Sequence, residues 1–242
     1  MQDIWRLITT WGTSPEFNMG LDEALLLEGD QPTLRLYTWS PDALSLGWFQ
    51  KATQVSEIES ASATVRRLTG GGAIHHEGEL TFSISCPQAH PLYRGPVGPS
   101  YARIHGAIIL ALRQIGLPAR LRGEEPLTSD NPASSMCFHH STPLDVAWNG
   151  RKGVGSAQRR KAGRVLHHGS IKVSSTPLEG SIATFENASE EHTAQSFAPL
   201  LLEHMRQHLG LQLVPSVPSR EERELAEDLG ARYSTDEWIR QR

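Results

Sequence analysis

The sequence has few cysteines, no long apolar run and no excess of basic residues. Its 242 residues contain two cysteines, Cys86 and Cys137, which excludes a disulfide framework and a four-thiolate zinc site. No apolar run could span a bilayer and no signal pattern opens the chain, so we expect a cytoplasmic protein without a membrane partner. The formal net charge of −4 argues against nucleic-acid binding.

Local patterns predict an α/β protein with many strands. Ser14 is the expected N-cap of a helix that ends at Gly29, and the pair Asn149-Gly150 predicts a type I′ hairpin turn. Other helices are expected over 54–61, 100–115 with Ser100 as cap, 195–209, and 219–229 with a capping box. Strands are expected over 5–8, 33–39, 43–47, 64–68, 80–84, 144–148, 153–157 and 165–173. No linker divides the chain, so we predict one domain, 1–242, with a helical C-terminal segment from about 215.

Three consecutive glycines, Gly70, Gly71 and Gly72, separate two β-like runs. Glycines cost backbone entropy and add no packing, so such a loop suits a place where backbone N–H groups approach a ligand. A plain hairpin connection is the simpler alternative. The arginines before the loop and the pair His75-His76 after it favour a binding site.

A second glycine-punctuated block, 149–158, surrounds Lys152. An ammonium group there could contact a carbonyl or phosphate oxygen, although spacing alone is more typical of a solvated hairpin lysine. The same hairpin carries Arg159, Arg160 and Lys161 with no acidic residue nearby. These three residues form either a solvated tip or a dock for an acidic partner.

Eleven histidines include three adjacent pairs, which raises the question of a metal site: His75-His76, His139-His140 and His167-His168. Adjacent residues of a strand point to opposite faces, so one histidine of each pair should face the core or a pocket and the other should face away. None of the usual metal-ligand spacings, H-x-H, H-x-x-x-H or H-E-x-x-H, occurs. We therefore predict no metal site.

Several motifs, taken together and in order, resemble those of the lipoate–protein ligase and octanoyltransferase superfamily. They are NMGLDEA (18–24), ALSLGWFQ (43–50), RRLTGGGAIHHEGELTFS (66–83), GRKGVGSAQRR (150–160), VLHHGSI (165–171) and, near the C-terminus, Arg232-Tyr233-Ser234 with Trp238. The resemblance covers nearly the whole chain. It implies a biotin/lipoyl-ligase-like α+β fold, with a mixed, largely antiparallel sheet flanked by helices, and a tunnel for a medium-length acyl chain.

The resemblance also implies site residues. Arg67 and the loop Gly70–Gly72 would line the acyl and head-group pocket, His76 takes the place of the motif histidine, and Lys152 would contact the reactive carbonyl. The remaining substrate-binding residues carried by these motifs are Gly155, Ser156, Ala157, His168 and Gly169. No cofactor is expected.

Cys137 decides between the reactions of this superfamily. It ends an aperiodic loop, 122–135, is followed by Phe138 and lies fifteen residues before Lys152. This pattern, like Glu79-Leu80-Thr81, resembles the cysteine-dependent octanoyltransferases that use acyl carrier protein. Two features depart from that branch. The branch often has arginine at the third position of Gly70–Gly72, where this chain has glycine as the ligases do. Asp145 replaces the branch's usual glutamate.

The chemistry of Cys137 supports this interpretation separately. A thiolate attacks a thioester readily, and a nearby ammonium such as that of Lys152 stabilises the thiolate. A lone cysteine is more often a small buried hydrophobe, the role expected here for Cys86.

The leading hypothesis is an acyltransferase of lipoic acid biosynthesis. It would move an octanoyl group from acyl carrier protein, through a Cys137 thioester, to a lysine of a lipoyl domain or of the glycine-cleavage H protein. Lys152 and backbone N–H groups would stabilise the oxyanion, and His76 or His168 is a possible base. The alternatives are an ATP-dependent lipoate–protein ligase, a lipoyl/octanoyl amidotransferase between proteins, and a non-catalytic acyl-binding relative. The resemblance implies an extra C-terminal domain in full-length ligases, and the chain after Gly210 is too short for such a domain, which disfavours the ligase.

Overall fold

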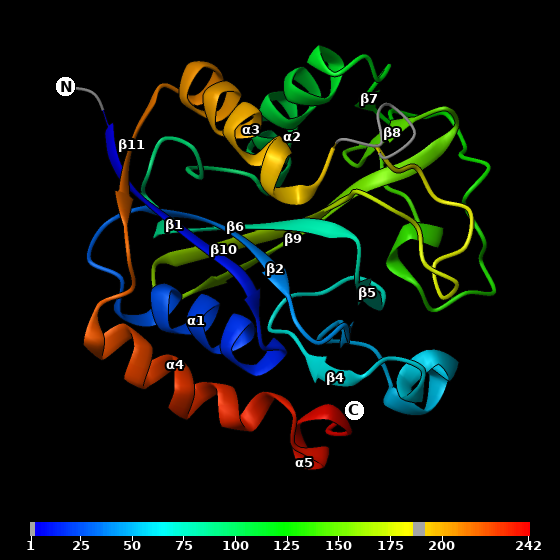
Figure 1. The fold of residues 1–242 in the computed structure, drawn as a ribbon, viewed down its shortest axis with the longest axis horizontal. Helices are drawn as coiled ribbons and strands as arrows, with labels where there is room; N and C mark the ends of the chain where they lie inside the picture. The colour runs from blue at the N-terminus through cyan, green and yellow to red at the C-terminus, as the bar shows by residue number, and fades with distance from the viewer. Residues whose placement is uncertain (1–2, 186–191) are drawn as a thin grey trace.

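The computed structural model describes residues 3–185 and 192–242, which form two β-sheets and flanking helices (Figure 1). The strands of the large sheet are β1 (Asp3–Thr13), β2 (Thr33–Trp39), β6 (Glu79–Pro87), β7 (Arg120–Leu121), β8 (Val146–Trp148), β9 (Arg151–Lys161), β10 (Arg164–Lys172) and β11 (Leu211–Ser216). Those of the small sheet are β3 (Ala43–Leu46), β4 (Ala63–Arg66) and β5 (Ile74–His76). The strand orders are β11-β1-β2-β6-β10-β9-β8-β7 and β4-β3-β5.

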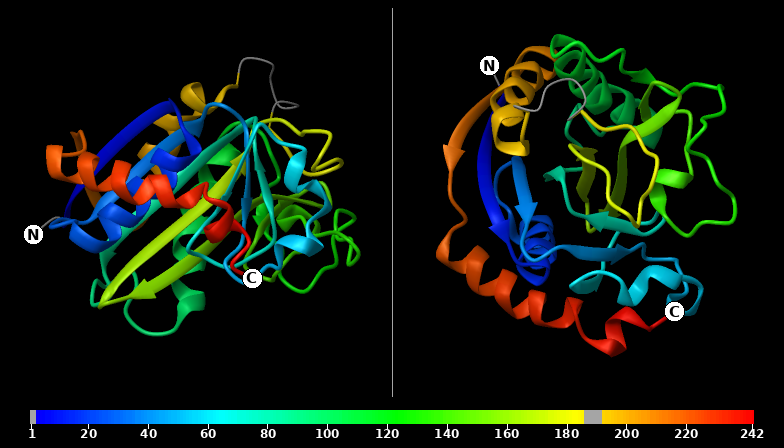
Figure 2. Two further views of the ribbon diagram at one scale, coloured as in Figure 1. Left: turned by 90° about the horizontal axis from the view of Figure 1, so that it is seen from below. Right: turned by 45° about the vertical axis from the view of Figure 1, so that its right-hand side comes forward.

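Most neighbouring strands are antiparallel; the parallel pairs are β11 with β1, β1 with β2 and β3 with β4. The helices are α1 (Pro15–Glu28), α2 (Val97–Gln114), α3 (Ala194–Leu209), α4 (Arg220–Tyr233) and α5 (Asp236–Ile239). The helices α2 and α3 pack over one face of the large sheet, around the main hydrophobic core, while α1 lies on the other face with α4 outside it (Figures 1 and 2). The predicted α+β fold with a largely antiparallel sheet is confirmed. No helix in the described ranges is long and apolar enough to cross a membrane.

Local sequence signals account for several element ends. Ser14 caps α1 by accepting a hydrogen bond from the Phe17 N–H at 3.2 Å, and Ser219 and Glu222 form the predicted capping box of α4. The turn residues Asn149 and Gly150 have φ values of 51° and 73°, as a type I′ turn requires. These predictions are confirmed.

Several predicted boundaries differ from the structure, three of them at helices. Ser100 is not the cap of α2, because the helix begins at Val97; Pro99 is tolerated in the first turn, where N–H groups have no intrahelical partner. The range 54–61 forms two short 3₁₀ turns, η1 (Ala52–Gln54) and η2 (Ser56–Glu59), separated by the extended residue Val55. Residues 215 and 216 belong to β11, at a sheet edge that tolerates Pro215, so the helical C-terminal segment begins at Arg220.

The last residues of the chain hold the strand that leads into the glycine-rich loop. The Arg66 guanidinium donates a 2.8 Å hydrogen bond from Nε to the Ile239 carbonyl, and the Trp238 indole N–H donates to the Arg66 carbonyl at 2.8 Å. The Ala52 N–H donates to the Arg242 carbonyl. Figure 2 shows this C-terminal end, in red, beside the cyan segment that contains η1 and η2.

Candidate active site

A cavity with about 420 Å³ of empty space lies between the large sheet, the small sheet and α1. Its surface is mostly apolar, as is common for ligand pockets. Ten of the predicted site residues line it: Arg67, Gly70, Gly71, His76, Cys137, Gly155, Ser156, Ala157, His168 and Gly169. The other two, Gly72 and Lys152, contact Cys137 from outside the lining.

Six further residues line the cavity and were not predicted: Met19, Tyr37, Trp39, Ile74, Thr81 and Ser170. Four of these lie within the motifs quoted above, so the motifs could have indicated them. Tyr37 and Trp39 come from β2. The alternation of residues along this segment predicts a strand but does not indicate which strands lie beside it.

The glycine-rich loop is shaped by Arg67 and packed against the cysteine. The Arg67 guanidinium donates to the carbonyls of Gly70 and Gly72 at 2.8 and 2.7 Å. A Cβ atom on Gly72 would lie 2.8 Å from the Cys137 nitrogen, so only glycine permits this approach. Burial lowers the pKa of Arg67 to about 10, with the neighbouring Cys137 opposing the shift, so the side chain stays charged at neutral pH.

Cys137 is held where its loop crosses the end of the glycine-rich loop. It begins the 3₁₀ turn η3 (Cys137–His139), and its N–H donates to the Ala73 carbonyl at 2.7 Å. The Ala73 N–H in turn donates to the Ser135 carbonyl at 2.9 Å, and the Ser135 hydroxyl donates to Glu57. The long aperiodic loop is therefore fastened on both sides immediately before the thiol.

Lys152 brings an ammonium group to the thiol. It follows the hairpin turn as the second residue of β9, is buried, and its Nζ lies 3.6 Å from Cys137 Sγ. Nζ also contacts the Asp145 carboxylate at 3.0 Å and the carbonyls of His140 and Cys137 at 2.9 and 3.1 Å. Burial opposes its charge, but the neighbouring Cys137 and Asp145 outweigh burial and raise the pKa of Lys152. Lys152 is therefore a fixed cation beside a partly buried thiol.

Gly155 leaves the space that this pair occupies. A Cβ atom there would lie 2.9 Å from Lys152 Cε and 3.7 Å from Cys137 Sγ. The glycine-punctuated block thus brings backbone, ammonium and thiol together at one end of the cavity.

His168 faces the cavity and is oriented by a buried carboxylate. Its Nδ1 lies 3.1 Å from Asp22 Oδ2 and its Nε2 lies 2.6 Å from the Thr69 hydroxyl. Burial would raise the pKa of Asp22, but the His168 hydrogen bond and the charge of Arg35 outweigh it and lower that pKa. Asp22 therefore stays ionised, which favours the tautomer of His168 with the proton on Nδ1.

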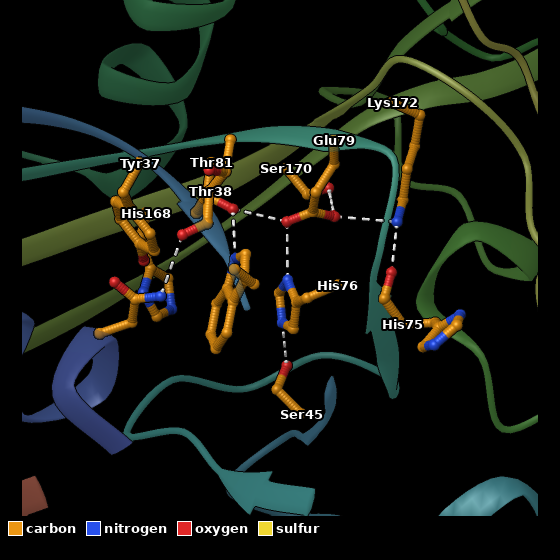
Figure 3. Close-up of polar contacts among 12 residues, drawn as sticks. Tyr37, Thr38, Ser45, His75, His76, Glu79, Thr81, His168, Ser170 and Lys172 are labelled. Atoms are coloured by element: carbon orange, nitrogen blue, oxygen red, sulfur yellow. Dashed lines mark hydrogen bonds and ion pairs between the residues drawn. The ribbon is translucent and has the colours of Figure 1, made fainter. Parts of the chain in front are cut away.

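His76 belongs to a second buried network (Figure 3). Its Nδ1 lies 2.7 Å from Glu79 and its Nε2 lies 2.6 Å from the Ser45 hydroxyl. Glu79 also pairs with Lys172 at 2.8 Å. Burial lowers the pKa of His76 to about 4, so the ring is neutral at pH 7 and both nitrogens are engaged.

The histidine pairs do point to opposite faces of their strands, but both faces are covered. His168 faces the cavity, whereas His167 contacts Ser156 and Tyr93 on the side of α2, and both are buried. The same burial holds for His75 and His76. The histidine that faces away from the cavity or core is also buried in these two pairs, because helices or the small sheet cover both sides.

One group of possible metal ligands occurs among the described residues: Asp42, His75 and Glu77, whose ligand atoms lie within 4.8 Å of one another. Both His75 nitrogens are already hydrogen-bonded at 2.9 Å, to Asp42 and to Thr176. Glu77 is exposed. The group is explained by these contacts without an ion.

Two other predicted features are now located. Cys86 is buried, and burial raises its pKa to about 12, which fits an unreactive thiol. In the basic hairpin, Arg159 lies over the Trp48 ring at 5.5 Å, Arg160 donates to the Gly95 carbonyl, and Lys161 is exposed.

The model of the lipoyl protein ligase A/B catalytic domain matches residues 14–217. The chain belongs to this family. An octanoyltransferase LipM of Kyrpidia tusciae is 36% identical over 270 aligned positions, covering 97% of each chain. The LipM of Moorella thermoacetica is 40% identical over 177 positions, covering 70% of this chain and 65% of that one. The predictions of the superfamily and of an acyltransferase are confirmed.

Solved structures of the family share this fold. A putative lipoate protein ligase from T. acidophilum with bound lipoic acid matches with a TM-score of 0.79 over all of both chains, at 23% identity. A lipoate-protein ligase A bound with ATP matches with a TM-score of 0.77 over 99% of both, at 23% identity. Assignment of residues 1–242 to a single catalytic domain stays a prediction, as do the roles of the site residues.

Proposed function

We propose that this chain transfers an octanoyl group from acyl carrier protein to a lysine of a lipoyl domain or of the glycine-cleavage H protein. The observation that carries the proposal is the 3.6 Å contact between Cys137 Sγ and the buried Lys152 ammonium at the end of an apolar cavity. The octanoyltransferase LipM relatives support the octanoyl group. Acyl carrier protein as donor, H protein as acceptor and a cytoplasmic location are parts of the proposal.

In the first step the Cys137 thiolate attacks the carbonyl carbon of the octanoyl thioester. A new carbon–sulfur bond forms, the bond to the carrier's sulfur breaks, and the carrier leaves as a thiolate that takes up a proton. The Lys152 ammonium stabilises the attacking thiolate, and backbone N–H groups stabilise the oxyanion. The N–H groups of Gly71 and Gly72 have no acceptor within the described ranges and suit this role.

In the second step the neutral amine of the acceptor lysine attacks the Cys137 thioester. An amide bond forms, the carbon–sulfur bond breaks, and the thiolate returns. The amine must lose a proton, and His168 is the better-placed base because it faces the cavity with Asp22 fixing its tautomer. Both nitrogens of each ring are hydrogen-bonded, and His76 is less suited because burial lowers its pKa to about 4.

Arg159, Arg160 and Lys161 are proposed as the dock for the acidic carrier. Arg159 lies four residues along β9 from Gly155, about 13 Å away at 3.3 Å per residue. This distance places the basic end of the hairpin outside the cavity, where a carrier protein can be attracted without blocking the thiol.

The test is a transfer assay without ATP. Octanoyl-carrier protein and a lipoyl domain are incubated with the enzyme, and the acceptor is weighed intact; octanoylation that is absent with Cys137→Ala supports the proposal. Modification by free lipoate that needs ATP and survives Cys137→Ala would instead identify a ligase. Transfer only from an octanoylated H protein would identify an amidotransferase, and octanoate binding without any modification would identify a binding protein.

A further inference from the structure

The acyl cavity shares one wall with a second, more open cleft. This cleft has about 1,020 Å³ of empty space and is bounded by the end of β2, the turn before β6 and the start of α3. Two residues line both hollows, Trp39 and His76. Their rings are stacked, with centroids 3.9 Å apart and an interplanar angle of 17°. Trp39 and His76 therefore form the wall that the cavity and the cleft share.

Several strands of the large sheet separate this wall from the thiol. Cys137 sits over Gly155 of β9, and the strands that follow in order are β10, β6 and β2, which carries Trp39. The Trp39 indole reaches back over β6, where it donates to the Thr81 hydroxyl. Two to three strand spacings of about 4.8 Å place the ring roughly 10–14 Å from the cysteine end.

An eight-carbon chain fits this length. With bonds of about 1.5 Å that zigzag at the tetrahedral angle, it extends roughly 9 Å from its carbonyl carbon. Adding a van der Waals contact of about 4 Å at the terminal methyl fills the distance from the cysteine end to the wall. A longer chain would have to displace the rings.

The rings are held firmly and carry no charge. The Trp39 indole N–H donates to Thr81 at 2.8 Å, and His76 lies between Ser45 and Glu79 at 2.6 and 2.7 Å (Figure 3 shows His76, Ser45, Glu79 and Thr81). Because burial keeps His76 neutral at pH 7, the wall presents aromatic carbon to a methyl end without a charge to desolvate. These three hydrogen-bond partners resist displacement of the rings by a few extra methylene groups.

We propose that the stacked Trp39–His76 pair is the end stop of the acyl cavity and limits the substrate to chains of about eight carbons. The inference rests on the proposed function, because it assumes that the acyl carbonyl is at Cys137. Loss of the indole should join the cavity to the cleft and let longer chains pass through the wall.

The experiment compares acyl-enzyme formation from octanoyl-, decanoyl- and dodecanoyl-carrier protein in the wild type, Trp39→Ala and the milder Trp39→Leu. The ratio of kcat/KM for dodecanoyl over octanoyl should rise at least about tenfold in Trp39→Ala, since each fully buried methylene is worth about fourfold and the cleft is only partly enclosed. Trp39→Leu should shift the ratio less and in the same direction. The matched control is Met19→Ala, which widens the cavity at α1 away from the cleft and should leave the ratio within about threefold.

An unchanged ratio in a folded Trp39→Leu or Trp39→Ala enzyme would overturn the end stop, as would an equal rise in Met19→Ala. If the wild type forms no acyl-enzyme with any chain, the proposed function fails instead. Binding of free octanoate and dodecanoate, measured by calorimetry on the same variants, then tests the end stop alone: it predicts that dodecanoate gains affinity only when Trp39 is shortened.

Discussion

Lys152 and Lys172 are two buried lysines whose surroundings give them different roles. Both approach the ring of Phe138, with Nζ 5.5 and 5.1 Å from its centroid. In both, burial opposes the charge but neighbouring anions outweigh it and raise the pKa. Burial and charge alone therefore do not distinguish them.

Their partners do. Lys172 contacts the carboxylates of Glu79 and Glu179, each at 2.8 Å, and donates to the His75 carbonyl at 2.6 Å, which uses all three of its protons. Lys152 has a single carboxylate, Asp145, and its remaining contacts are two carbonyls and the Cys137 sulfur. An ammonium saturated by carboxylates stabilises the fold, whereas one that faces a thiol can stabilise a charge that develops during a reaction.

The largest effect should come from Lys172→Met. It leaves Glu79 and Glu179 buried without their cation, which should lower the free energy of unfolding by about 3–5 kcal/mol. Urea denaturation measures this loss. The double variant Lys172→Met/Glu179→Gln removes one of the unpaired carboxylates and should recover part of the lost stability. A loss below about 1 kcal/mol in the single variant would contradict the structural role of Lys172.

Lys152→Met should act on catalysis. Acyl-enzyme formation from octanoyl-carrier protein should slow by about 10²–10³-fold, the usual cost of removing one group that stabilises developing charge. Stopped-flow mixing or quenched mass spectrometry measures the rate, and circular dichroism shows whether the variant is folded at the assay temperature. A folded variant with an unchanged rate would mean that Lys152, like Lys172, is structural.

The network around Lys172 should also make stability depend on pH. The pKa of His76 is about 4 in the folded chain against about 6.5 when unfolded, so between these values the unfolded chain binds a proton that the folded chain does not. Stability present at pH 7 should therefore fall by about 3 kcal/mol from His76 alone as the pH drops to 4. His105 and His167, whose pKa values burial also lowers, add to the fall.

Denaturation of His76→Asn at both pH values isolates its share. The variant should lose less stability on acidification than the wild type does. An identical fall in both proteins would show that His76 does not carry this part of the pH dependence.

Near Lys152 we expect a smaller effect on catalysis, caused by the close contact between the glycine-rich loop and the loop that carries Cys137. Gly72→Ala places a Cβ atom within 3 Å of the Cys137 and Ser135 backbones and must shift the thiol, so kcat should fall by about 10–100-fold. Gly70→Ala is the matched control, because its Cβ atom would meet only the Phe49 ring at 3.5 Å. Steady-state transfer rates that fall equally in both variants would contradict the proposed contact between the loops.

The contrast between the lysines also shows how far sequence reasoning extends. Motifs around Lys152, with Cys137 fifteen residues before it, were enough to predict their shared site. Lys172 carried no such signal, since its partner Glu79 faces it only in the ladder between β6 and β10. Strand alternation predicts which face a residue takes but not which strand lies beside it.

The missing knowledge of which strands pair also explains why other residues and one strand were not predicted. Tyr37 and Trp39 enter the cavity only because β2 lies beside β6, a pairing that the sequence pattern does not specify. The strand β11 was missed because Pro215 is unfavourable within a strand, although the sheet edge accepts it. Helix caps and the hairpin turn were predicted correctly because their causes lie within a few neighbouring residues.

The central claim is that Cys137 carries the acyl group. Its most direct test is the intact mass of the Cys86→Ala enzyme after incubation with octanoyl-carrier protein alone, without ATP or acceptor, followed by peptide mapping. We predict the mass of one added octanoyl group, located on Cys137 and discharged when a lipoyl domain is added. An unmodified enzyme that nevertheless octanoylates the lipoyl domain would contradict the claim.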